Sequence, residues 1–147
     1  GVLITFGAFR MVDMGDLTAD REYDLVCPAN KIGTVDLFLV SHHGSNLSNS
    51  LPFVRAISPR VALMDNGPSK GGDADVWQRI RDTRGLLDLW QLHYALNSDK
   101  AHNPPDTFIA NVDTICEAKW IKVQVQKDGT FQVTNTRDKF QKTYVKR

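Results

Sequence analysis

The sequence predicts a layered α/β domain with a mixed sheet, flanking helices and a C-terminal β-hairpin. Short apolar runs of strand length alternate with helical patterns over the first two thirds of the chain. Glycine-containing turns join paired β-rich runs at both ends, at Gly7-Ala8 and at Asp128-Gly129. The 147 residues are 41% hydrophobic, which fits one globular domain over 1–147.

The chain opens with a predicted hairpin followed by a short helix. The β-rich runs at 2–6 and 9–13 are close enough to pair through the two-residue turn. Thr18 is placed to cap a helix over 19–27, which Pro28 ends.

The middle of the chain repeats strand and helix. The run at 35–40 is nearly all apolar, which is typical of an interior strand covered on both faces. A short helix at 51–57 leads to a second buried strand at 61–64, and apolar residues at helical spacing predict a helix over 74–84.

The last third is predicted to contain two further β elements. Residues 86–96 read as a strand, and 97–106 as a polar surface loop. Alternating runs about Asp128-Gly129 predict a hairpin over 119–136, and the Lys/Arg-rich stretch 137–147 is expected to be a solvated basic tail.

Charge and composition exclude several classes of protein. Eighteen Lys and Arg against 17 Asp and Glu leave a net charge of +1, too small for a broad nucleic-acid surface, so nucleic acid is not an expected partner. No apolar run reaches the about 18 residues that span a bilayer, and the first residues read as strands rather than a signal peptide. We expect no membrane association and, by default, a cytoplasmic location.

The densest group of potential ligands is the segment 41–45, Ser-His-His-Gly-Ser, at the exit of a buried strand. Sites in open α/β folds lie at such strand ends. Neighbouring side chains of a strand face opposite ways, so we expect one of His42 and His43 to bind a metal while the other holds substrate or donates a proton. The alternative is a pair of structural histidines.

A carboxylate follows the earlier strand in the same way. Asp16, in Gly15-Asp16, offers an oxygen of the kind that bridges two divalent ions, and Asp13 could substitute for it. Read alone, Gly-Asp after a strand indicates only a turn or a helix cap.

With these segments in order, the sequence resembles the C-terminal half of the metallo-β-lactamase fold superfamily. Within that superfamily, it looks most like the hydrolases related to the β-lactamase-like domain of the bacterial DNA-uptake competence protein. The resemblance covers roughly residues 1–95 and rests on five matching segments: 9–14 with Gly15-Asp16, 35–40, 42–45, the Ser/Asn tract 46–50, and 58–63.

The resemblance implies half of an αββα sandwich and a dinuclear zinc or manganese centre. Asp16 would match the bridging aspartate, and the pair His42-His43 would contain the last histidine ligand, with His43 preferred because it precedes Gly44. A metal-bound hydroxide in that family attacks a phosphoester, ester or amide.

The sequence departs from the family in lacking half of the metal ligands. No His-x-His-x-Asp-His motif occurs, and the remaining histidines are His93, in an apolar strand, and His102, in a polar loop. Any metal site would therefore be incomplete, and no catalytic residue is assigned. The chain is either part of a metal-dependent hydrolase or a non-catalytic binding or assembly module.

Three further residues are candidate substrate contacts. Ser45 follows the histidine pair, and His93 is expected in a strand as a core or cleft residue. Lys70 lies in the glycine-rich loop 69–73, which could form an anion-binding nest or could be only a flexible loop before a helix.

The predicted half-sandwich has consequences for partners. Half of a sandwich would leave one apolar sheet face open, so we expect a homodimer through that face or a complementary N-terminal half-domain.

Overall fold

The computed structural model describes residues 1–146 and confirms a mixed α/β fold with two sheets. The strands of the larger sheet are β1 (Val2–Phe6), β2 (Phe9–Asp13), β3 (Leu37–Leu39), β4 (Val61–Met64), β5 (Asp88–His93) and β6 (Ile109–Asn111). The smaller sheet contains β7 (Ile121–Val125), β8 (Phe131–Asn135) and β9 (Gln141–Tyr144). Short 3-10 turns cover Ser41–Gly44, Lys100–His102 and Asp106–Phe108.

The larger sheet places consecutive strands side by side, in the order β1-β2-β3-β4-β5-β6. β1 and β2 form the predicted antiparallel hairpin, whereas β2 to β6 all run parallel. The hairpin turn needs a glycine, because Gly7 has a φ of +59° and an added Cβ would lie 2.1 Å from the Lys127 carbonyl oxygen.

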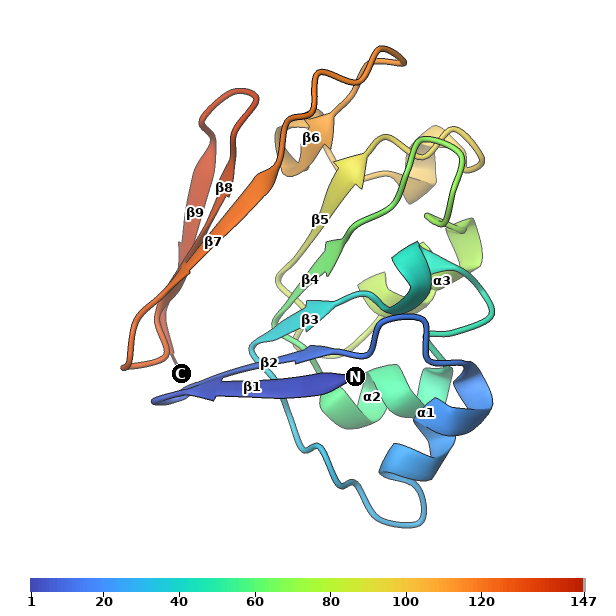
Figure 1. The fold of residues 1–147 in the computed structure, drawn as a ribbon, viewed down its shortest axis with the longest axis vertical. Coiled ribbons are helices and arrows are strands. Elements are labelled where there is room, and N and C mark those ends of the chain that lie inside the picture. Colours follow the sequence, from blue (N-terminus) through green and yellow to red (C-terminus); the bar gives the residue numbers. More distant parts are fainter. Residues whose placement is uncertain (147) are drawn as a thin grey trace.

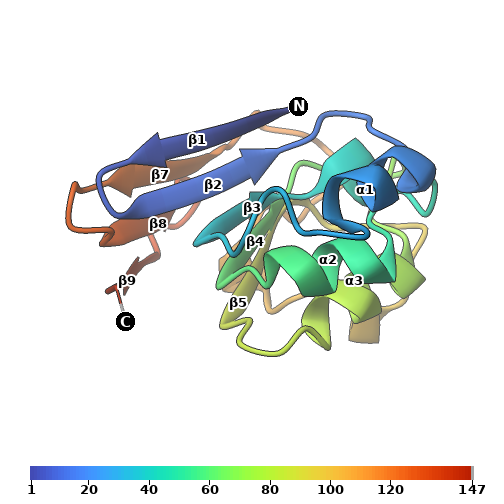
Figure 2. The same cartoon turned by 90° about the horizontal axis from the view of Figure 1, so that it is seen from below.

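Three helices cover one face of this sheet: α1 (Ala19–Val26), α2 (Leu51–Ile57) and α3 (Ala74–Arg81) (Figure 2). They share one face because each crossover between neighbouring parallel strands has the same hand and proceeds in the same direction. The helices and the sheet enclose an apolar cluster that includes Val12, Phe38, Phe53, Ala62 and Ile80. No helix among residues 1–146 is long and apolar enough to cross a membrane.

The smaller sheet covers the opposite face of the larger one (Figures 1 and 2). Phe9 of β2 meets Phe131 of β8 edge to face, with ring centroids 5.3 Å apart. Trp90 of β5 is fully buried and donates its indole N–H to the Tyr144 hydroxyl of β9 at 3.0 Å. The expectation of an open sheet face is therefore wrong for β2 to β5, because the chain covers that face itself.

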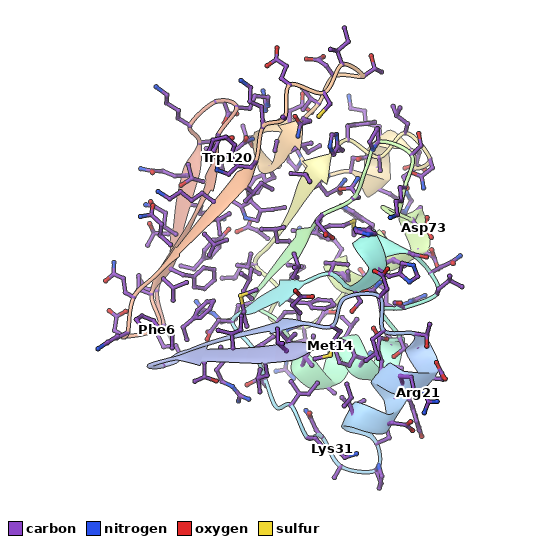
Figure 3. The ribbon with its side chains drawn as sticks, in the orientation of Figure 1. Phe6, Met14, Arg21, Lys31, Asp73 and Trp120 are labelled. Atoms are coloured by element: carbon purple, nitrogen blue, oxygen red, sulfur yellow. The ribbon has the colours of Figure 1, made fainter. Side chains whose placement is uncertain are left out.

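The edge strand β1 remains exposed. Four of its apolar residues, Val2, Leu3, Ile4 and Phe6, are 41–53% exposed, and Phe6 is marked in Figure 3. β1 pairs with β2 on one side only, so its other edge presents unpaired backbone groups.

The segment predicted as a solvated basic tail instead contains β9, with residue 147 outside the described residues. Two of its lysines form ion pairs: Lys142 contacts Asp88 at 2.7 Å, and Lys146 contacts the buried Asp36 at 3.0 Å. The predicted hairpin over 119–136 is confirmed as β7 and β8, and β9 extends it to three strands.

Candidate functional site

The predicted ligands gather at one edge of the larger sheet. β2, β3 and β4 are parallel neighbours, so the segments that follow them meet at the carboxyl ends of the strands. A cavity of about 170 Å³ lies there, lined by Asp13, Gly15, Asp16, Leu39, Val40, His42, His43 and Asp65.

A tight turn places Asp16 after β2. The Asp13 side chain accepts a hydrogen bond from the Gly15 N–H at 2.8 Å, and Gly15 has a φ of +56°. The Gly15 carbonyl then accepts a hydrogen bond from the His42 N–H at 2.9 Å, which joins the exits of β2 and β3. The Asp16 side chain is 64% exposed and free to take a ligand from solvent.

Both histidines after β3 have left-handed backbone. The strand ends at Leu39, and φ is 53° at His42 and 58° at His43. The expectation that strand geometry would turn the two side chains to opposite faces is therefore wrong, and both line the cavity. Such conformations cost on the order of 1–3 kcal/mol each and concentrate at functional sites.

The glycine-rich loop before α3 supports the histidine turn. The Gly72 N–H donates to the His43 carbonyl at 2.9 Å, and the Asp73 N–H donates to the Gly44 carbonyl at 3.0 Å. A Cβ on Gly71 would lie 1.9 Å from the His43 oxygen, so only glycine permits this approach. The loop therefore positions the His43 backbone.

His43 lies between two carboxylates. Its Nδ1 is 3.3 Å from Asp65 Oδ2 and 3.2 Å from the Asp65 carbonyl oxygen. Its Nε2 is 4.0 Å from Asp16 Oδ1. With Nδ1 held by Asp65, the other ring nitrogen faces Asp16 and is available as a ligand.

His42 is held by the loop that follows it. Its Nδ1 lies 3.3 Å from Ser48 Oγ. The fully buried Glu22 of α1 accepts hydrogen bonds from the Asn49 N–H at 2.9 Å and the Ser50 N–H at 2.7 Å. The Asn49 side-chain amide donates to the Ser41 carbonyl at 2.9 Å. A buried network thus ties α1 to the residues around His42.

The three candidate substrate contacts lie outside the cavity lining. The Ser45 hydroxyl accepts a hydrogen bond from the Leu47 N–H at 3.3 Å, and Lys70 is exposed. His93 ends β5 at the same sheet edge; burial lowers the pKa of its imidazole, and its Nε2 lies 4.0 Å from Cys116 Sγ. The structure brings Asp16, His42 and His43 together but leaves these three apart.

Asp65 is the site residue that the sequence analysis missed. It directly follows β4, just as the histidines follow β3 and the Gly-Asp pair follows β2. A carboxylate directly after a buried parallel strand was the available signal.

The cavity matches a divalent metal in the kind of its donors but not in their number. Imidazole and carboxylate are ligands of zinc and manganese, but His43 Nε2 and Asp16 Oδ1 are 4.0 Å apart. Two ligands of a tetrahedral zinc ion lie about 3.3 Å apart, so one of these side chains would have to move to share a metal ion with the other. A catalytic zinc site uses three protein ligands. Within residues 1–146, no group of three or more His, Cys, Asp or Glu side chains is arranged to hold a metal ion.

Comparison with models of protein families, with curated proteins and with solved structures found no match to this chain.

Proposed function

We propose that this chain supplies half of the active site of a metal-dependent hydrolase, with Asp16 and His43 as ligands of a zinc or manganese ion. The observation that supports this proposal is the convergence of Asp16, His43 and Asp65 on one cavity at the ends of three parallel strands. The left-handed backbone at both histidines also supports the proposal, because strained backbone conformations concentrate at sites where side chains must be held in a defined orientation.

Asp65 acts as the positioning residue of the proposed site. Metal-bound histidines usually give their second ring nitrogen to a carboxylate or a carbonyl, which fixes the tautomer and the ring orientation. Asp65 offers both groups to His43 Nδ1. When bound, the metal would lower the pKa of a water molecule and stabilise an oxyanion, as hydrolysis of a phosphoester, ester or amide requires.

The missing ligands would come from a complementary half-domain, as in the metallo-β-lactamase fold that the sequence resembles. The exposed edge of β1 supports such a partner, because its apolar residues and unpaired backbone would be covered by another strand.

Metal binding by the purified chain tests the proposal. Calorimetric titration with Zn²⁺ and with Mn²⁺ should show one weak site whose affinity is abolished in Asp16→Ala and His43→Ala. Asp65→Asn should weaken binding about 10- to 100-fold, because it alters the partner of His43 Nδ1.

The matched controls are His102→Ala and Asp99→Ala, since this pair is in contact at 2.7 Å in a different loop. If the controls lost as much affinity as the site variants, or if Asp16→Ala and His43→Ala bound metal like the unaltered chain, the proposed site would be wrong.

A non-catalytic assembly module is the second candidate, and the exposed edge of β1 favours it too. Two copies could pair their β1 strands antiparallel and form one continuous sheet. Light scattering after gel filtration should then give a dimer at micromolar concentration, and Ile4→Lys should give a monomer, since a charged edge residue opposes pairing. A monomeric unaltered chain would contradict dimerisation.

A further inference from the structure

A cysteine and a histidine lie in contact on the side of the larger sheet that is away from β1. His93 ends β5, and Cys116 lies in the loop between β6 and β7, which extends beyond the carboxyl ends of β5 and β6 (Figure 1). The Cys116 Sγ is 4.0 Å from His93 Nε2, at the long end of the range for hydrogen bonds that involve sulfur. Cys116 is exposed and His93 is half-buried, so a thiol that solvent reaches has a base beside it.

The buried Asn111 of β6 fixes this loop against β5. Its side-chain amide donates hydrogen bonds to the Leu92 carbonyl at 3.0 Å and to the Lys119 carbonyl at 2.9 Å. Its side-chain oxygen accepts the Lys119 N–H at 3.1 Å and lies 3.8 Å from Cys116 Sγ. Because Asn111 is only 5% exposed, a buried side chain sets the position of the thiol next to His93.

The groups around the sulfur favour the loss of its proton. The Ala118 N–H donates to Cys116 Sγ at 3.4 Å, which stabilises negative charge on the sulfur. Burial lowers the pKa of the His93 imidazole, so the ring is mostly neutral at pH 7 and its Nε2 can accept a proton. Glu117, which follows Cys116, forms an ion pair with Lys119 at 3.4 Å, and its charge is therefore offset. A nucleophile within hydrogen-bond reach of a neutral base is the arrangement of an activated thiol.

We propose that Cys116 is a nucleophile activated by His93, and that it forms covalent adducts with α,β-unsaturated carbonyl compounds. His93 Nε2 takes the thiol proton as the sulfur attacks the β-carbon, and the electron pair of the carbon–carbon double bond moves to form an enolate. The α-carbon then takes the proton back from His93, so no group leaves and no oxidant is needed. Neither residue lines the cavity of the proposed metal site, so the two proposals are independent.

Acrylamide, an α,β-unsaturated amide, is the probe that tests the proposal. Mass spectrometry after incubation at pH 7, with EDTA present to remove metal ions, measures the rate of modification at each cysteine. Cys116 should react at least fivefold faster in the folded chain than in the chain unfolded in urea, because unfolding separates the thiol from its base. An ordinary thiol, with a pKa near 8.5, is about 3% ionised at pH 7, so the gain should not exceed about 30-fold.

His93→Gln should lower the rate at Cys116 at least fivefold, because glutamine keeps a hydrogen-bonding side chain but cannot take the proton. The matched control is His102→Gln, which removes a histidine paired with Asp99 in a different loop and should leave the rate at Cys116 unchanged. The rate at Cys27, the other thiol of the chain, reports whether each variant is folded and should be equal in all three proteins.

The proposal would be overturned by equal rates at Cys116 in the folded and unfolded chains. It would also be overturned if His93→Gln, with an unchanged rate at Cys27, reacted at Cys116 like the unaltered chain, or if His102→Gln lost as much reactivity as His93→Gln. If the rate at Cys27 rose in His93→Gln, showing that this variant does not fold, the comparison of the folded and unfolded chains would decide, since it needs no variant.

Discussion

The left-handed backbone of His42 and His43 depends on residues that are distant in sequence. Neither position carries the glycine or asparagine that usually adopts this conformation, so the sequence predicted a strand end there instead. The same sequence did locate the cluster, because polar ligand types directly after an apolar strand are visible without a structure. The backbone conformation of the cluster could not be predicted, because it is stabilised by contacts with Gly71 and Gly72, which are distant in sequence.

Gly71→Ala should lower the free energy of unfolding by more than Gly85→Ala does. Both glycines have positive φ, +68° and +91°, which costs an alanine about 1–2 kcal/mol. Only Gly71 meets another atom, the His43 oxygen, so about 1–3 kcal/mol more should be lost. Urea denaturation measures both changes, and equal losses would argue against the close contact with His43.

Among the elements, regular hydrophobic patterns were predicted well and short strands poorly. The sequence located β4 and α2 at the residues where the structure has them, since both are apolar and bounded by turn residues. It missed β6, with three residues, and β9, whose one buried residue, Tyr144, follows three exposed ones. Alternation over so few residues gives no period to recognise. The packing of β9 comes from tertiary contacts.

The attachment of β9 should depend on pH through Tyr144. Burial first, and the hydrogen bond to Asp88 second, raise the pKa of the Tyr144 hydroxyl far above its usual value near 10. Above about pH 10 the unfolded chain loses this proton while the folded chain retains it, so stability falls as the pH rises. The free energy of unfolding, measured between pH 9 and 11, should therefore fall more steeply for the unaltered protein than for Tyr144→Phe. Parallel pH profiles would contradict this prediction.

At the scale of the whole molecule, the two sheets share one apolar core and should unfold together. Phe131 of the smaller sheet is 1% exposed and lies in a cluster with Phe9, Leu37 and Trp90 of the larger one. The arrangement of helices, larger sheet and smaller sheet in three layers was not predicted. The alternating pattern of a hairpin shows which face of each strand is apolar, but not which other part of the chain that face packs against.

Phe131→Ala should destabilise the whole protein by about 3–5 kcal/mol. Its neighbour Gln132 is only half-buried, and Gln132→Ala should change stability by less than about 0.5 kcal/mol. Far-ultraviolet circular dichroism and tryptophan fluorescence should give coincident unfolding curves in both variants. Two separate transitions would show that the smaller sheet is an independent unit.

Two pockets at opposite ends of the parallel strands are lined by charges of opposite sign, although the net charge of the chain is only +1. The cavity at the carboxyl ends is lined by three carboxylates, from Asp13, Asp16 and Asp65. The surface pocket at the opposite ends has Arg10, Arg60 and Lys146 around the single carboxylate of Asp36. The local field therefore attracts cations to the cavity at the carboxyl ends and repels them from the surface pocket at the opposite ends.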